Sequence, residues 1–150
     1  MKYQVMNRAH EYEVDINWVQ DRAGILYSPE LNDEIQVVTP PQFPKGVGKI
    51  WSPEHLFIAA INSCLMTTFL SIAEHSKLEF KKFKSKAYGK LESIEGKYMM
   101  SEIKLMPALT IYKGEDRAKA LKVLQKSEAA CLISNSVKSK IIFQPEIIVL

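Results

Sequence analysis

The stretch SPEHLFIAAINSCLMTTFLSIAE, residues 52–74, contains the features that decide the fold. Ser52 is a favourable N-cap, and Pro53 suits the first helical position, where its missing N–H costs nothing. Glu54 follows in the first turn, where the helix dipole favours a carboxylate. The stretch therefore predicts a helix from Ser52 to about Ser76, which at 1.5 Å per residue is on the order of 35 Å long.

This helix is apolar on nearly all of its sides, and we therefore expect it to be a long central helix that is covered on nearly all sides. Small polar residues interrupt the apolar run, namely Asn62, Ser63, Thr67, Thr68 and Ser71. These interruptions favour a buried helix of a soluble protein over a membrane span. One thiol, Cys64, lies near the middle of the helix.

Three short strands are predicted before the helix. Residues 12–19, YEVDINWV, alternate between apolar and polar side chains, and short apolar segments follow at 25–27 and 34–38. Turn residues separate the three segments, which is typical of a meander. Residues 39–51 contain three prolines and two glycines, and we expect a long irregular loop of the kind that often has a function.

A hairpin is predicted directly after the helix. Residues 83–95 and 97–112 have the alternation of long strands, and Gly96 between them indicates a tight turn. Pro107 lacks an N–H, so its place within the second strand predicts a bulge or a sheet edge there.

The rest of the chain predicts an amphipathic helix at 114–131, a helical turn within 132–139 and a closing strand at 140–150. The element order is then β-β-β-α-β-β-α-β. This order is typical of an α+β fold with antiparallel sheets.

Length and composition predict a single soluble domain over residues 1–150. The hydrophobic fraction of 47% can bury a core without a disulfide or a metal, and the net charge of +3 gives no case for a nucleic-acid partner. The N-terminal residues include no apolar signal region, so we expect a cytoplasmic protein without a membrane partner. In that reducing compartment two cysteines are expected to be free or transiently bonded.

Cys64 and Cys131 are the first candidates for chemistry. A free cysteine in an apolar helix is usually a small buried hydrophobe, and burial opposes its ionisation. Cys131 lies at the end of the second predicted helix, next to a polar turn. The two residues fit a peroxidatic and resolving pair only if the fold brings them together.

Arg22 and Glu54 are the second pair of candidates. Arg22 lies in a turn between short strands, where it is either a surface residue or a guanidinium that stabilises a thiolate or a peroxide oxygen. Glu54 is either a simple helix-start carboxylate or the group that orients this arginine through a bidentate pair. The three histidines show no metal-ligand spacing, and no cofactor-binding motif is present.

Together these residues resemble the OsmC/Ohr family, named for osmotically inducible protein C and organic hydroperoxide resistance. SPEHLFIAAINSC at 52–64 is similar to the family's first cysteine motif, CLISNS at 131–136 to its second, and DRAG at 21–24 to its arginine turn. Leu132 stands where the hydroperoxide reductases usually have proline. This difference places the chain nearer the general OsmC-like branch.

The resemblance implies a thiol-dependent peroxidase that reduces organic hydroperoxides to alcohols in oxidative stress defence. Cys64 would be the peroxidatic cysteine and Cys131 the resolving cysteine, while Arg22 holds the Cys64 thiolate and Glu54 fixes Arg22. No bound cofactor is implied, since the reductant is an external dithiol of the lipoyl type.

The resemblance also implies an intertwined homodimer with its active sites at the interface. Glu54 and Cys64 are about 15 Å apart along one helix, so they share a compact site only if one of them comes from a second chain. A partner would also cover the apolar circumference of the helix.

Two other functions fit the sequence. One is a non-enzymatic OsmC-like dimer that binds a small hydrophobic ligand or senses oxidation. The other is a structural domain whose cysteines are plain core residues.

Overall fold

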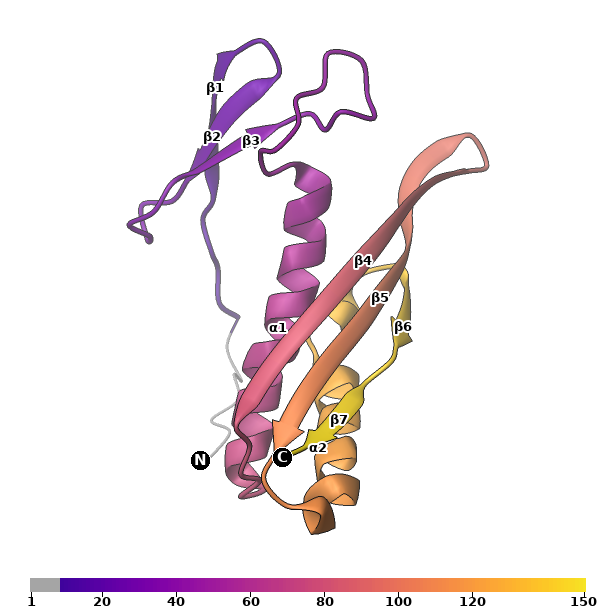
Figure 1. Cartoon of the computed structure of the whole chain (residues 1–150). Coiled ribbons are helices and arrows are strands. Elements are labelled where there is room, and N and C mark those ends of the chain that lie inside the picture. Colours follow the sequence, from indigo (N-terminus) through magenta and orange to yellow (C-terminus); the bar gives the residue numbers. More distant parts are fainter. Residues whose placement is uncertain (1–8) are drawn as a thin grey trace. The chain divides into compact units, whose positions relative to one another are not determined.

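The computed structural model describes residues 9–150, which form two compact units with a boundary between Leu56 and Phe57 (Figure 1). The first eight residues, on which part of the expectation about the N-terminus rests, lie outside the described residues. The single-domain organisation stays a prediction, and each unit is described by itself.

The first unit contains an antiparallel sheet in the order β1-β2-β3, which confirms the predicted meander. Its strands are β1 (Asp15–Gln20), β2 (Ala23–Tyr27) and β3 (Ile35–Val38). The turn between β1 and β2 requires a positive φ of 47° at Asp21, a conformation that Asp tolerates better than most residues. This turn carries Arg22.

The loop at 39–51 has no helix or strand, as predicted. Backbone hydrogen bonds nevertheless fix it, from the Val47 N–H to the Thr39 carbonyl at 2.8 Å and from the Val38 N–H to the Trp51 carbonyl at 2.9 Å. A Cβ on Gly46 would overlap the carbonyl oxygen of Pro40. Only glycine fits this close approach of two backbone segments.

The long helix α1 (Pro53–His75) confirms the predicted position and length. Ser52 caps it, because its Oγ accepts the His55 N–H at 3.1 Å, and the same Oγ shares a hydrogen bond of 2.6 Å with His55 Nδ1. The buried residues recur every fourth position, at Ile61, Leu65, Phe69 and Ala73. This spacing makes one narrow stripe, so only one face of α1 is fully buried within the chain.

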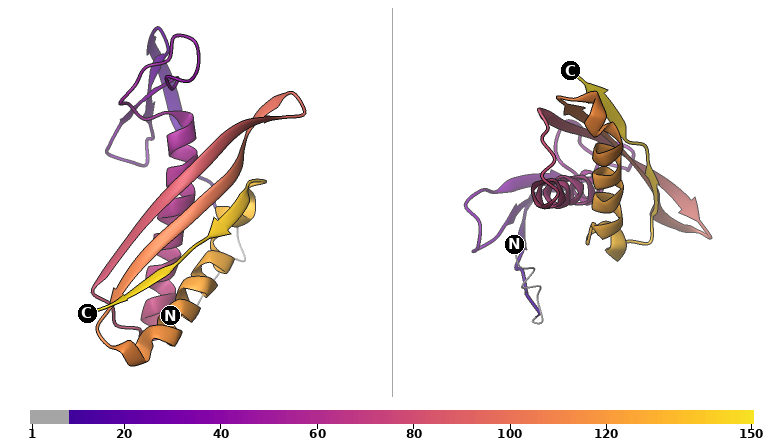
Figure 2. Two further views of the ribbon diagram at one scale, coloured as in Figure 1. Left: turned by 45° about the vertical axis from the view of Figure 1, so that its right-hand side comes forward. Right: turned by 90° about the horizontal axis from the view of Figure 1, so that it is seen from below.

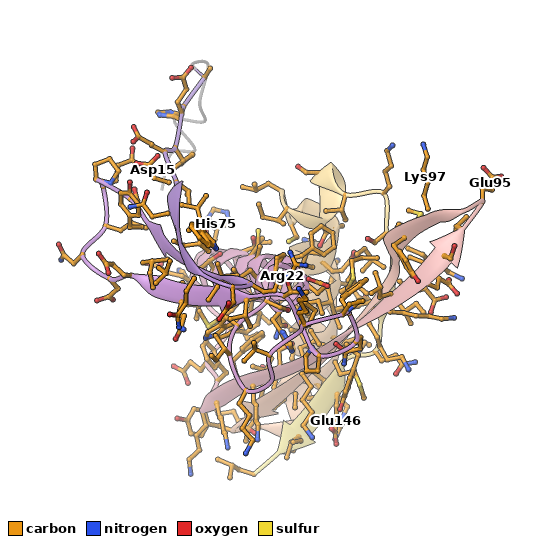
Figure 3. All side chains as sticks on the ribbon, turned by 90° about the horizontal axis from the view of Figure 1, so that it is seen from above. Asp15, Arg22, His75, Glu95, Lys97 and Glu146 are labelled. Atoms are coloured by element: carbon orange, nitrogen blue, oxygen red, sulfur yellow. The ribbon has the colours of Figure 1, made fainter. Side chains whose placement is uncertain are left out.

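The second unit is built on a long hairpin of β4 (Lys82–Ile94) and β5 (Lys97–Ile111), as predicted. Glu95 and Gly96 form its turn with φ values of 51° and 78°, a pair of positive values that matches the right-handed twist of the strands. Figure 3 shows the side chains of Glu95 and Lys97 pointing away from the protein at the tip.

The fold class is confirmed as α+β, but the second sheet is mixed rather than antiparallel. The segment 140–150 forms two short strands, β6 (Lys140–Phe143) and β7 (Glu146–Val149), and both pair with β5 in parallel. Strands β6 and β7 run parallel to β5 because the helix α2 (Arg117–Ala130) carries the chain back in the opposite direction after β5.

The prediction of a bulge or an edge at Pro107 is wrong. Pro107 is buried in the central strand and pairs regularly with Ser85, whereas the register shift lies between Lys90 and Leu91. The carbonyls of Leu105 and Ile111 accept bonds on the side of β6 and β7. Because backbone groups alternate in direction along a strand, the nitrogen of Pro107 faces the same side as the carbonyls of Leu105 and Ile111. It lies there opposite the break between β6 and β7, where no N–H is needed for pairing.

Helix α2 (Arg117–Ala130) follows a 3-10 turn, η1 (Gly114–Asp116), and a second 3-10 turn, η2 (Ser134–Ser136), follows Cys131. Helices α1 and α2 both pack on one face of the mixed sheet (Figure 2). The main cluster between them is formed by Phe69, Ala73, Leu78, Leu109, Ile111, Ala120, Val123 and Leu124. The second unit therefore has two layers, helices on a sheet.

Helix α1 keeps an uncovered apolar face within the chain. Met66 is 39% exposed and Leu70 43% exposed. Among residues 9–150, α1 is the helix that is long and apolar enough to cross a membrane, with a mean hydropathy of 1.9 over 18 residues, a test that core helices of soluble proteins also pass.

Asn62 links α1 to β4 through hydrogen bonds with Ser85, and its replacement measures how much this polar contact stabilises the unit. Its Nδ2 donates to the Ser85 carbonyl at 3.0 Å, and the Ser85 hydroxyl donates to its Oδ1 at 2.6 Å. We expect Asn62→Ala to lower the free energy of unfolding in urea by about 1–3 kcal/mol, because half-buried partners lose their bonds. Ser63→Ala, at an exposed position on the same helix, is the control and should change it by less than about 0.5 kcal/mol. Equal losses in the two variants would contradict this role of Asn62.

Candidate functional site

The structure brings Cys64 and Cys131 together in the second unit. Cys64 lies in the middle of α1 and is half-buried, whereas Cys131 follows the last residue of α2 and has no exposed surface. The Cys131 Sγ lies 4.0 Å from the carbonyl oxygen of Ile61, one turn before Cys64 on α1. The thiols are within hydrogen-bonding reach of one another, and both are free.

The surroundings of Cys64 favour its thiolate. Burial opposes ionisation of this thiol, but four hydrogen-bond donors around the sulfur outweigh burial and lower its pKa. These donors are the Ile133 N–H, the Cys131 thiol, the Thr68 hydroxyl and the Leu132 N–H. The Thr68 Oγ1 lies 3.8 Å from the Cys64 Sγ.

The surroundings of Cys131 favour its neutral thiol. Burial raises the pKa of Cys131 above its ordinary value, although the hydroxyl and N–H of Ser134 act in the opposite direction. The nearby Cys64 adds to the increase. The pair is therefore asymmetric, with a lowered pKa at the half-exposed sulfur of Cys64 and a raised pKa at the buried sulfur of Cys131.

Arg22 and Glu54 both belong to the first unit, but the structure does not join them. Glu54 is half-buried in the first turn of α1. Arg22, labelled in Figure 3, is exposed on the turn between β1 and β2. Among residues 9–150 the one ion pair within 4.0 Å is Lys90 with Glu92, so the predicted bidentate pair of Arg22 and Glu54 is not formed in this chain.

Arg22 lines an open pocket of about 310 Å³ within the first unit. The pocket walls are mostly apolar, with Ile16, Trp18, Val37, Val38 and Pro53 around the guanidinium. The Trp18 Nε1–H donates to the Asp21 carbonyl at 3.1 Å and so fixes the indole beside the arginine turn. Such a pocket can hold a small apolar molecule that has one polar or anionic end.

Three contributors to the cysteine pair are not among the predicted site residues: Thr68, the N–H groups of Leu132 and Ile133, and Ser134, which the sequence marks only as part of the motif CLISNS at 131–136. Thr68 could have been found, because a residue four positions after Cys64 lies on the same helix face. The backbone N–H groups and the Ser134 hydroxyl give no such signal, since their direction depends on how the turn after α2 packs against α1.

Comparison with known proteins identifies relatives for nearly the whole chain. The family model described as OsmC-like protein matches residues 46–146. The uncharacterized protein YmaD of Bacillus subtilis (strain 168) is 24% identical over 142 residues, which are 91% of this chain and 93% of YmaD.

Solved structures share the fold. An OsmC-like protein of unknown function from Vibrio cholerae superimposes with a TM-score of 0.82 at 22% identity, over 91% of this chain and 99% of that chain. An organic hydroperoxide resistance protein from Elizabethkingia anophelis gives 0.76 at 19% identity, over 97% and 100% of the two chains. At these identities the likeness shows the fold alone.

The asymmetry of the two thiols predicts a difference in their reactivity with pH. The thiolate is the form that alkylates, and its fraction rises with pH through the pKa of the group. Because the pKa of Cys64 is lowered and that of Cys131 raised, we expect the iodoacetamide rate at Cys64 to reach half its maximum at the lower pH. Site-resolved mass spectrometry of the native protein follows both thiols; because Cys131 has no exposed surface, its modification requires local opening and should also be slower than that of Cys64 at every pH. Coinciding profiles, or the reverse order, would contradict the described geometry.

Proposed function

Because the chain belongs to the OsmC-like family, we propose that it is a thiol-dependent peroxidase that reduces organic hydroperoxides to alcohols. The observation that carries this proposal is the contact between a half-exposed Cys64 with a lowered pKa and a buried Cys131. A peroxidatic cysteine must be an accessible thiolate, and a resolving thiol must lie within its reach.

The chemistry begins at the Cys64 thiolate. Its sulfur attacks the outer oxygen of the hydroperoxide, the O–O bond breaks, and the alkoxide that leaves takes a proton to become the alcohol. Cys64 is then a sulfenic acid. The Cys131 thiol condenses with this sulfenic acid, which releases water and forms a Cys64–Cys131 disulfide. An external dithiol, proposed to be of the lipoyl type, reduces the disulfide and is itself oxidised.

Arg22 and Glu54 have roles in this proposal that depend on a second chain. The guanidinium of Arg22 polarises the peroxide and stabilises the charge near Cys64. Glu54 makes no ion pair with Arg22 in this chain, so it would orient the arginine only once a second chain brings the two side chains together. Glu54 and Cys64 are about 15 Å apart along α1, so Arg22 and Glu54 would serve the Cys64 of a partner subunit. In this proposal the protein is a homodimer with two interface sites, and it is located in the cytoplasm.

A second function is favoured by the pocket around Arg22. Its apolar walls and single guanidinium suit a small hydrophobic ligand. In that case the protein is a non-enzymatic OsmC-like dimer that binds such a molecule or senses oxidation. Peroxide turnover distinguishes the two functions, since ligand binding alone consumes no peroxide.

The peroxidase proposal predicts that Cys64→Ser abolishes consumption of cumene hydroperoxide with dihydrolipoamide as reductant. Cys131→Ser should consume about one equivalent and then stall, because its sulfenic acid has no partner thiol. Ser63→Ala, next to Cys64 on the exposed face of α1, is the control and should turn over like wild type. Wild type and Cys64→Ser consuming peroxide at equal rates would end the proposal.

The two-chain site predicts complementation between inactive variants. Arg22→Ala and Cys64→Ser are each expected to be inactive, but their mixed dimer has one site with both wild-type residues if these come from different chains. After random reassortment of equal amounts we expect about a quarter of the wild-type turnover, because half of the dimers are mixed and each has one intact site. No recovery in a mixture shown by mass spectrometry to contain mixed dimers would place Arg22 and Cys64 of one chain in the same site.

A further inference from the structure

Ser134 has a buried hydroxyl without a hydrogen-bond partner among residues 9–150. The residue is only 7% exposed, and its Oγ forms no hydrogen bond with any described atom. A buried hydroxyl without a partner costs free energy. The hydroxyl and the N–H of Ser134 lie close enough to the Cys131 sulfur to act against the increase of its pKa.

The residues just before Ser134 direct their N–H groups at the other sulfur. The amides of Leu132 and Ile133 both act on the Cys64 thiol. The carbonyls of the same turn are occupied elsewhere, since Cys131 O accepts the Asn135 N–H at 3.0 Å and Leu132 O accepts the Ser136 hydroxyl at 2.7 Å. The turn therefore presents hydrogen-bond donors to the two sulfurs, whereas the carbonyls of Cys131 and Leu132 are occupied by other hydrogen bonds.

Packing holds this turn in place. The side chain of Ile133 packs against the cluster of Ile61, Leu65, Ile103 and Leu105, so the backbone on either side of it is fixed relative to α1. Leu132 has the opposite setting, because its side chain is 64% exposed. The contribution of Leu132 to the site is thus its backbone N–H and not its side chain.

We propose that the N–H of Leu132 and the hydroxyl of Ser134 stabilise negative charge on the sulfurs of Cys64 and Cys131, respectively, during the thiol–disulfide cycle. This inference rests on the proposed function. It assigns a donor to Leu132 that proline at the same position would lack, because proline has no N–H.

The two donors act in different steps. The Leu132 N–H stabilises the Cys64 thiolate before it attacks the peroxide. In the reductive step a thiolate of the external dithiol attacks the half-exposed Cys64 sulfur, the S–S bond breaks, and Cys131 leaves as a buried thiolate. The Ser134 hydroxyl donates to this leaving sulfur, and the second thiol of the dithiol then releases Cys64 from the mixed disulfide. A better-stabilised leaving thiolate leaves faster.

Leu132→Pro and Leu132→Ala separate the N–H from the side chain. Cys131 has φ −65° and ψ 108°, the extended conformation that a residue before proline prefers, so the proline variant is expected to fold. At pH 6 we expect Leu132→Pro to lower the alkylation rate of Cys64 by about three- to tenfold, because the thiolate loses one hydrogen bond. Leu132→Ala, which keeps the N–H, should match wild type. Equal rates in the two variants would overturn the assignment to the backbone.

Ser134→Ala and Ser134→Thr test the hydroxyl. Wild type and both variants are first oxidised with diamide to the Cys64–Cys131 disulfide and then reduced with dithiothreitol. We expect Ser134→Ala to slow the reduction by about three- to tenfold and Ser134→Thr, which keeps a hydroxyl, to restore most of the rate. Reduction of the alanine variant at the wild-type rate, or failure of diamide to form the disulfide in wild type, would overturn the inference.

These measurements separate the inference from the proposed function. Alkylation and dithiothreitol reduction need no peroxide, so their expected results can hold in a protein that does not turn peroxide over. In that outcome the peroxidase proposal fails and the donor assignment stands. If peroxide is turned over but the variants alkylate and are reduced at unchanged rates, the donor assignment fails and the peroxidase proposal stands. Should Leu132→Pro not fold, the Ser134 pair still decides whether this turn acts on the sulfurs.

Discussion

The packing of α1 against β5 and the turn after α2 is the contact on which the candidate site depends. Ile61 and Leu65 of α1 meet Ile103 and Leu105 of β5, and Ile133 packs against the same cluster. Cys64 lies between Ile61 and Leu65 in the sequence, so the contact that buries these two residues also sets the position of the sulfur. The burial of a few aliphatic side chains, each contributing about 1.5–3 kcal/mol, thereby positions the two thiols.

The same packing explains why the two cysteines differ. Cys131 lies under the helix against the Ile61 carbonyl and has no exposed surface, whereas Cys64 faces the side of α1 that the chain leaves partly open. Burial penalises the charged form of both thiols, but the amides of the 132–133 segment reach only Cys64. A direct hydrogen bond to a thiolate then outweighs partial desolvation. The proposed order of the roles, with Cys64 first and Cys131 second, therefore rests on the direction of backbone N–H groups.

Much of the fold could be predicted from local signals. The cap at Ser52, the glycine turn at 96 and the alternation in the hairpin strands are decided by neighbouring residues, and the structure confirms all three. The prediction for Pro107 is wrong. Its missing N–H falls opposite the break between β6 and β7, and the place of that break is a long-range feature that neighbouring residues do not decide. The parallel pairing of the last two strands could not be predicted either, since the return path of the chain through α2 decides it.

The candidate site also contains some features that the sequence could predict and others that it could not. The sequence motifs point to Cys64 and Cys131, and the structure brings them together; Thr68 follows from helical spacing and could be predicted as well. The amides of Leu132 and Ile133 could not, because every residue except proline has an N–H and only packing decides where it points. Leu132 stands where the family motif usually has proline, and the difference that bears on the site is the backbone N–H, which proline lacks.

Two features of α1 support the proposed homodimer. Met66 and Leu70 leave apolar surface exposed on a helix that otherwise forms the core of its unit, and such surface is stabilised when another protein surface covers it. The predicted residues Glu54 and Cys64 are also about 15 Å apart along this helix, too far to act on one small substrate. In the proposed homodimer, pairing of α1 with a copy of itself would cover the apolar face and bring the start of one helix toward the middle of the other. The half-exposed Cys64 would then be part of the interface, within reach of the proposed partners Arg22 and Glu54 from the second chain.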